Sequence, residues 1–339
     1  MISRRDFLKT SALAVGSLSM PSLVGCAGGS KETAPATPTS KSFIGLQTYS
    51  VGQELGEDVP AGLAKLKSFG YTDLELAGYR EGKQGGIDPA EYKKMCDDAG
   101  LKITSAHVGT PSQYKTPEEQ FIEEWKKTVE DHVTMGAGWI IDPSMPQCAT
   151  VDEVKLACER FNKAGEICKA AGIQFGYHNH NNEFNKIATP EEMEEGRKKV
   201  IEMIKTRFNM PNPSEEMVNN MMSRGGNAPG NYYEKLYMDF TDPELVMFEL
   251  DCYWCMIGDQ DPCEWIRDYK DRIKMLHIKD RWIIGDSGMM NWPNIFKTAY
   301  EAGIEKWFVE LEGNGKGRTQ MEGVEESAKF LLAAPYVKA

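Results

Sequence analysis

The chain has 339 residues, of which 51 are Asp or Glu and 39 are Lys or Arg, so its formal net charge is -12. This length suits one large α/β barrel or two ordinary domains. The acidic balance argues against nucleic acid as a partner, because such a surface repels phosphate backbones.

Residues 1–26 have the features of an export signal rather than of folded structure. The twin-arginine start Ser3-Arg4-Arg5-Asp6-Phe7-Leu8-Lys9 precedes an apolar run that is too short to span a bilayer. Leu23-Val24-Gly25-Cys26 resembles the lipobox of bacterial lipoproteins, and the alternative is a plain cleaved signal. Residues 27–40, rich in Gly, Ser, Thr and Pro, should form a flexible tether. We therefore expect an exported protein of the cell envelope or periplasm that touches the membrane only through a lipid anchor at Cys26.

From residue 41 onward, a short apolar strand followed by an amphipathic helix recurs. Strands are predicted at 43–48, 73–76, 102–107, 138–142, 173–178, 246–251, 273–278 and 306–311. Helices are predicted at 62–69, 92–99, 118–135 and 151–171, each ended by a glycine. Eight strands joined by helices favour a (β/α)8 TIM barrel, an α/β fold, over an open doubly wound sheet. No Gly-x-Gly-x-x-Gly follows the first strand, which weakens a dinucleotide-binding alternative. Residues 41–339 should form this single barrel.

One connection is much longer than the others. Between the fifth and sixth predicted strands, a polar, Met-rich and Asn-rich insertion covers about residues 189–233. Long loops on ordered barrels are lids, oligomer contacts or flexible inserts. Because this insertion follows a strand, it starts on the face where barrel active sites lie. We expect it to cover the substrate, with an oligomer contact as the alternative.

Histidines and carboxylates gather at the predicted C-terminal ends of the strands, where the reactive residues of a barrel lie. Four of the five histidines fall there, together with four carboxylates: His107, His178, His180, His277, Glu183, Asp251, Glu310 and Glu312. A divalent metal needs such groups from separate, rigid elements. The predicted ligands are Glu183, Asp251, His277 and Glu310. The spacing leaves open that His178 or His180 replaces Glu183, and that Glu312 replaces Glu310.

Four segments, taken in order, resemble the xylose isomerase-like barrel superfamily, and most nearly its sugar phosphate isomerase/epimerase branch. They are Tyr177-His178-Asn179-His180-x-x-Glu183-Phe184, Phe248-Glu249-Leu250-Asp251-x-Tyr253-Trp254, Leu276-His277-Ile278-Lys279-Asp280 and Phe308-Val309-Glu310. The resemblance covers nearly all of residues 41–339. It implies one divalent ion, manganese first and magnesium, cobalt or zinc as alternatives, on the four ligands named above. Relatives with a plain glutamate on the fifth strand have it where His178 stands, and the insertion departs from shorter members.

A site of this type suits removal of a proton from a carbon next to a carbonyl. The resemblance implies that Glu183 and Glu310 act as bases on opposite faces of the substrate. His180 is a further catalytic candidate, and His107 and His178 are candidates for substrate binding.

Two more side chains could contact the substrate. Lys279 shares a strand face with the predicted ligand His277, so it could stabilise an oxyanion or, alternatively, pair with Asp280. Trp254 could form an apolar wall for a sugar ring or take part in ordinary packing.

The expected function is a metal-dependent isomerase or epimerase acting on an unphosphorylated sugar or keto-sugar. Phosphorylated sugars are cytoplasmic, and no cluster of arginines marks a phosphate site. A lyase that eliminates from 3-keto-glycosides is the rival, and a non-catalytic sugar-binding lipoprotein is a weaker alternative. A nuclease of the superfamily would need more histidines and a basic groove.

Overall fold

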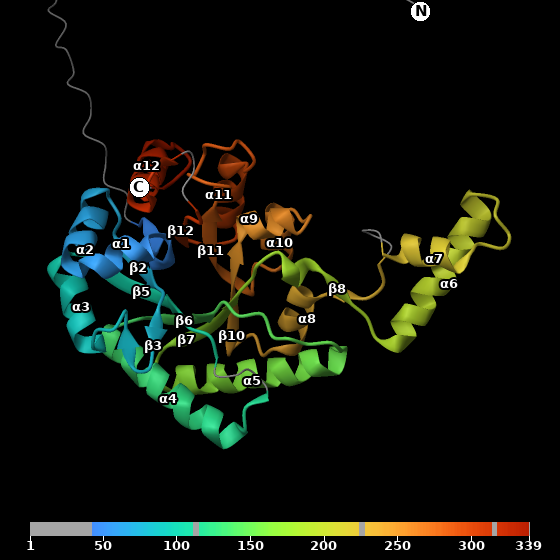
Figure 1. Ribbon diagram of the computed structural model, residues 1–339, viewed down its shortest axis with the longest axis horizontal. Helices are drawn as coiled ribbons and strands as arrows, with labels where there is room; N and C mark the ends of the chain where they lie inside the picture. The colour runs from blue at the N-terminus through green and yellow to red at the C-terminus, as the bar shows by residue number, and fades with distance from the viewer. Residues whose placement is uncertain (1–42, 111–114, 224–227, 314–316, 339) are drawn as a thin grey trace, which may run out of the picture. The chain divides into compact units, whose positions relative to one another are not determined.

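The computed structural model describes residues 43–110, 115–223, 228–313 and 317–338. Eight parallel strands close into a barrel in the order β1, β12, β11, β10, β7, β6, β5, β2 (Figure 1). Their bounds are β1 Gly45–Gln47, β2 Asp73–Leu76, β5 Lys102–His107, β6 Trp139–Asp142, β7 Gln174–His178, β10 Val246–Asp251, β11 Ile273–Lys279 and β12 Lys306–Glu310. This confirms the predicted (β/α)8 TIM barrel. The predicted export signal and tether lie outside the described residues.

Helices cover the outside of the barrel (Figure 1). The predicted ones are α2 Val59–Ser68, α3 Pro89–Asp98, α4 Glu118–Met135 and α5 Val151–Ala170. Four more helices alternate with the last strands. They are α9 Cys252–Ile257 and α10 Pro262–Asp268 after β10, α11 Trp292–Glu301 after β11, and α12 Gln320–Ala333 after β12. Among the described residues, no helix is long and apolar enough to cross a membrane.

Short elements complete the barrel ends. After β1 come a 3-10 turn, η2 Thr48–Val51, and α1 Gly52–Glu57. After β2 comes a two-stranded antiparallel sheet of β3 Tyr79–Arg80 and β4 Lys83–Gln84.

The strands separate an apolar shell from the barrel interior. Phe248 and Leu250 of β10 join the main core beneath the helices, whereas Met247 belongs to a small separate cluster with Ile141, Met275 and Phe308. Since strand residues two apart share a face, Glu249 and Asp251 follow Met247 into the barrel, and His277 and Lys279 follow Met275. The interior therefore has an apolar floor with polar layers above it.

The insertion is built of regular elements rather than a loop. A small antiparallel sheet, β8 Lys186–Ile187 with β9 Asn231–Tyr232, brackets helices α6 Pro190–Arg207 and α7 Glu215–Met222, and α8 Tyr233–Phe240 returns the chain to the barrel. Thr189 and Glu192 form a capping box at the start of α6, which explains why this polar segment is helical.

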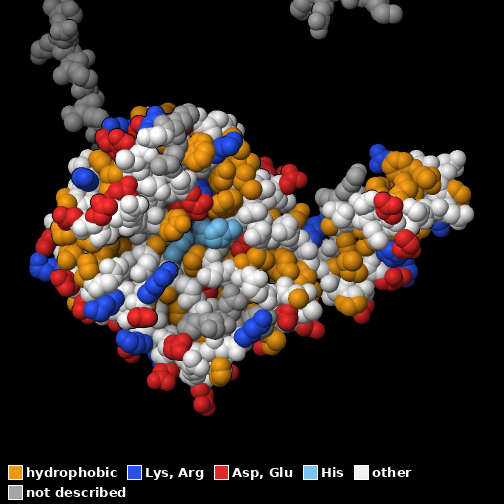
Figure 2. All heavy atoms as spheres, in the orientation of Figure 1, with side chains coloured by type: hydrophobic (Ala, Val, Ile, Leu, Met, Phe, Trp, Pro, Cys, Tyr) orange, Lys and Arg blue, Asp and Glu red, His pale blue; other side chains and the backbone are white. Residues whose placement is uncertain are grey.

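The two helices of the insertion bury their own apolar residues against each other. Val200 and Ile204 of α6 pack with Val218 and Met222 of α7 in a cluster separate from the main core. The pair lies to one side of the histidine cluster, which stays visible in an open hollow of the surface (Figure 2). The expected substrate cover is therefore not formed by α6 and α7 in this structure.

Candidate metal centre

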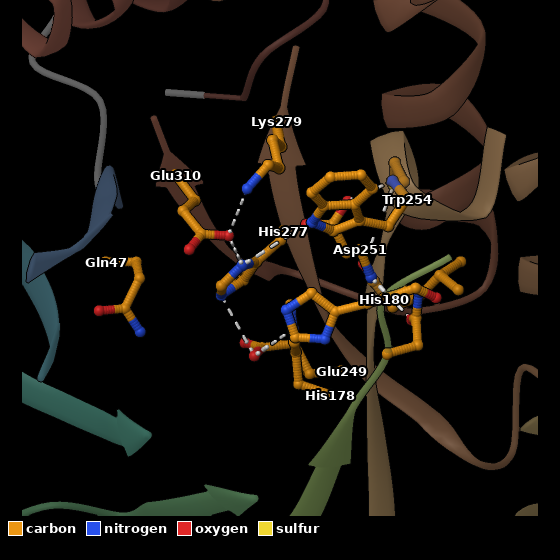
Figure 3. A network of polar contacts seen from close by, with 12 residues as sticks. Gln47, His178, His180, Glu249, Asp251, Trp254, His277, Lys279 and Glu310 are labelled. Atoms are coloured by element: carbon orange, nitrogen blue, oxygen red, sulfur yellow. Dashed lines mark hydrogen bonds and ion pairs between the residues drawn. The ribbon is translucent and has the colours of Figure 1, made fainter. Parts of the chain in front are cut away.

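The polar interior of the barrel brings together side chains from widely separated strands (Figure 3). His178, Asp251, His277 and Glu310 each offer one nitrogen or oxygen atom, and these four atoms lie within 4.8 Å of one another. Three of the four are predicted ligands, and the fourth, His178, is the alternative that the sequence left open. All four side chains are buried. Glu312 is not part of this group.

Only one of the two carboxylate oxygens of Asp251 accepts a hydrogen bond. Its Oδ1 caps the following helix by accepting a hydrogen bond from the Trp254 backbone N–H at 2.8 Å. Its Oδ2 is buried and has no hydrogen-bond partner. Burial raises the pKa of Asp251, opposed by the positive charges of Lys279 and His277. A buried carboxylate oxygen without a hydrogen bond is costly, and a bound cation would remove that cost.

His277 stands at the middle of the network, with a carboxylate at each ring nitrogen. Its Nδ1 lies 3.1 Å from Glu310 Oε2, and its Nε2 lies 2.7 Å from Glu75 Oε2. A metal-binding histidine usually donates its other ring N–H to a carboxylate, which fixes the tautomer. The ring therefore suits a ligand role through Nδ1, on the side of Asp251 and Glu310.

Lys279 is paired with Glu310 at the end of β12 and with Glu312 just beyond it, rather than with its neighbour Asp280. Its Nζ lies 3.1 Å from Glu310 Oε2 and 2.7 Å from Glu312 Oε1. Asp280 instead accepts hydrogen bonds from the backbone N–H groups of Arg281 and Gly285. Lys279 is almost wholly buried, so it brings a fixed positive charge to the rim of the site.

His180 and Trp254 line the same side of the site, above His178. The His180 ring lies 5.1 Å from the His178 ring and 6.0 Å from the Trp254 ring, measured between centroids. Lys279 Nζ lies 5.1 Å from the centre of the indole. Burial lowers the pKa of His180, so its imidazole is neutral at neutral pH and can accept a proton.

Glu183, the fourth predicted ligand, is not brought to this group. It lies in a 3-10 turn, η4 Asn182–Phe184, that leads the chain away from the end of β7. Its carboxylate accepts hydrogen bonds from the Tyr177 hydroxyl at 2.6 Å and from the His180 backbone N–H at 3.0 Å. Tyr177 packs on Phe161 and Tyr237 outside the strand, so Glu183 serves the outer face of β7.

A deeper polar layer contains residues that the sequence reasoning missed. Glu75 and Glu249 are fully buried and contact His107 and His277, and Gln47 donates to Glu75 at 3.0 Å. His107, predicted to bind substrate, belongs to this layer. Burial opposes its ionisation, but the charge of Glu75 and the hydrogen bond to Glu249 raise the pKa of His107 to about 9.

The comparisons with known proteins agree with the barrel fold. Residues 63–207 match the model of the xylose isomerase-like TIM barrel family. The crystal structure of a sugar phosphate isomerase/epimerase from Parabacteroides distasonis ATCC 8503 is 48% identical in sequence, covers 90% of this chain and 100% of its own, and superposes with a TM-score of 0.75. The chain belongs to the xylose isomerase-like TIM barrel family.

Two more distant matches are a solved structure of the same fold and a curated protein. The 3-keto-D-glucoside 4-epimerase from E. coli is 15% identical, with a TM-score of 0.54 over 86% of this chain and 99% of its own, so it shares the fold. An inosose dehydratase from Geobacillus kaustophilus (strain HTA426) is 20% identical over 64% of this chain and 60% of its own length. The chain thus spans about three fifths of that curated relative.

Proposed function

We propose that this chain is a divalent-metal-dependent sugar isomerase or epimerase that abstracts a proton next to a carbonyl group. The observation that carries the proposal is the convergence of His178, Asp251, His277 and Glu310 at the open end of the barrel. Kinship with sugar isomerases and epimerases supports the same reading.

The donor set fits a divalent ion. Two imidazoles and two carboxylates are ligands that manganese, cobalt and zinc accept, and Oδ2 of Asp251 is a buried ligand atom without a hydrogen bond. When bound, such an ion polarises the substrate carbonyl and stabilises the negative charge left by proton removal. We favour manganese, with magnesium, cobalt or zinc as alternatives.

Glu310 and the side chains around the four residues would transfer the proton and bind the substrate. Glu310 is the candidate base on the β12 side. His180 is the candidate on the other side, in place of Glu183, whose carboxylate is occupied by Tyr177 and the His180 backbone. Lys279 would hold a substrate hydroxyl or a developing oxyanion, and Trp254 would pack against the sugar ring.

An unphosphorylated sugar or keto-sugar suits the charges of the site. Four buried carboxylates, Glu75, Glu249, Asp251 and Glu310, would repel a phosphate group. Lys279, which contacts this network, is already paired with Glu310 and Glu312. We also propose, from the sequence, that the protein is exported and lipid-anchored at Cys26; labelling with a radioactive fatty acid, lost in Cys26→Ser, tests this.

The proposed reaction can be tested by isotope exchange. The manganese-loaded chain is incubated in heavy water with candidate ketoses and 3-keto-glycosides, and recovered sugars are analysed by NMR. Deuterium on the carbon next to the carbonyl, together with an epimer or isomer, is the expected result. Absence of exchange with every metal and sugar would instead favour a sugar-binding protein without turnover.

A lyase is the second candidate, and kinship with inosose dehydratase is the observation in its favour. After proton removal, the electron pair left on carbon could expel the group on the neighbouring carbon instead of recapturing a proton. The same experiment separates the two functions, because elimination from a 3-keto-glycoside releases the aglycone, whereas epimerisation retains it.

A further inference from the structure

Beneath the proposed metal centre, two imidazole nitrogens and two carboxylate oxygens face one another. His107 Nε2 lies 3.1 Å from Glu75 Oε2 and 2.9 Å from Glu249 Oε2. His277 Nε2 lies 2.7 Å from the same Glu75 oxygen and 3.2 Å from the same Glu249 oxygen. The four residues come from β5, β2, β10 and β11, so rigid strands fix this arrangement.

Hydrogen bonds alone do not account for these four contacts. Each Nε2 atom carries at most one hydrogen, so two hydrogens are available for four short nitrogen-to-oxygen distances. In both Glu75 and Glu249, only the Oε2 atom contacts the two histidines. Both side chains are fully buried, and their Oε1 atoms have no hydrogen-bond partner. Such a convergence of lone pairs is typical of ligands around a cation.

The spacing fits a common ion. Ligand atoms that lie about 2.0–2.2 Å from one metal ion are separated from each other by roughly 2.9–3.5 Å, and three of the four distances, 2.9, 3.1 and 3.2 Å, fall in that range. His178 adds a fifth nearby atom, with its Nδ1 at 3.4 Å from Glu249 Oε2. The ligand atoms of His107, His178, Glu249 and His277 also lie within 4.8 Å of one another.

The buried charges favour a cation as well. Glu75 and Glu249 bring two carboxylates into the barrel interior, where an uncompensated charge is very costly. The imidazoles of His107 and His277 are neutral when they act as metal ligands, so they do not then balance these two charges. Lys279 is directed to Glu310 and Glu312, and Gln47 is neutral. A divalent ion between the two carboxylates would balance both of them.

We propose that Glu75, His107, Glu249 and His277 form a second divalent-cation site, one layer below the first. The ring of His277 would bridge the two ions as an imidazolate, with Nδ1 facing the upper ion and Nε2 facing the lower. The Nε2 proton that His277 otherwise donates to Glu75 would be released to solvent when the lower ion binds. This inference goes beyond the proposed function, which needs only the upper ion. The lower ion would hold the His277 ring in place and neutralise the deep carboxylates.

Counting bound ions tests the proposal. The full chain is stripped with a chelator and titrated with Mn²⁺, and free Mn²⁺ is followed by its electron paramagnetic resonance signal. Manganese is chosen because it prefers oxygen and imidazole ligands to cysteine thiols. The expected result is two ions per chain for the unmodified protein, one for Glu249→Gln or Glu75→Gln, and one for Asp251→Asn.

Glu234→Gln is the matched control, because Glu234 is another fully buried glutamate that lies outside this group. It should leave the count at two, and circular dichroism should show that every variant is folded. A count of one in the unmodified chain, unchanged in Glu249→Gln, would overturn the second site and leave the proposed function intact. Loss of all manganese in Glu249→Gln would also overturn it, because the deep carboxylates would then serve the upper ion. No binding at all would contradict both proposals.

Discussion

Glu183 and His180 are joined by a 3.0 Å hydrogen bond in which the His180 backbone N–H donates to the Glu183 carboxylate. The Tyr177 hydroxyl donates to the other oxygen of the same carboxylate at 2.6 Å. Glu183 therefore ties the loop that carries His180 to the outer face of β7. We therefore propose a positioning role for Glu183 in place of the ligand role that the sequence suggested.

Glu183→Gln should retain full metal binding while lowering kcat. The amide offers a single acceptor oxygen, so one of the two contacts is lost and the His180 loop shifts. A misplacement of this kind costs roughly tenfold to a hundredfold in turnover. Calorimetric titration with Mn²⁺, together with turnover of the best sugar, checks the prediction, and Tyr177→Phe should have the same effect. Loss of manganese in Glu183→Gln would restore Glu183 as a ligand.

His180→Gln should abolish most of the turnover without changing metal affinity. Removing a positioned acid or base typically costs about a hundredfold to ten-thousandfold in rate. Incorporation of solvent deuterium should fall in parallel with product formation, because both depend on the same proton transfer. If exchange continues at the unmodified rate, His180 does not carry the proton, and Glu310 or another group must do so.

Glu234→Gln should stabilise the protein in a pH-dependent way. Burial, and then the negative charge of Glu183, raise the pKa of Glu234 well above its usual 4.5. The folded chain therefore retains a proton that the unfolded chain releases, so stability falls as the pH rises above about 4.5. Glutamine does not titrate, and its gain, about 1–3 kcal/mol, should appear at pH 8 and vanish at pH 4. Thermal melts of both chains in chelator measure it. An equal gain at pH 4 would contradict the assigned cause.

The paired helices α6 and α7 should unfold independently of the barrel. Ile204 is fully buried, but its apolar neighbours Val200, Val218 and Met222 all lie in the same pair of helices. Ile204→Ala should cost about 2–5 kcal/mol there and speed hydrogen exchange in α6 and α7 alone, whereas Leu250→Ala should destabilise the barrel. Turnover should be unchanged in Ile204→Ala. A large fall in turnover would show that these helices act in catalysis after all.

The sequence predicted the barrel because every strand is an apolar run bounded by turn residues, and it predicted three of the four grouped ligand candidates because they end strands. Glu249 was within reach of the same reasoning, since it precedes Asp251 by two residues on one strand face. Glu75 was not, because its contact with His277 joins residues 202 positions apart. Glu183 lies outside the group of four because it stands in a 3-10 turn, which its spacing from His178 did not reveal. The helix α6 could have been predicted from the sequence, because Thr189 and Glu192 have the spacing of a capping box.

The central claim is that side chains from four separate strands hold a divalent ion at the mouth of the barrel. Anomalous X-ray diffraction from manganese-loaded crystals tests it most directly. The expected result is an anomalous peak about 2.0–2.3 Å from Asp251 Oδ2, His277 Nδ1 and the nearest atoms of His178 and Glu310, and no such peak in Asp251→Asn. A manganese-loaded crystal without anomalous density between these atoms would contradict the account.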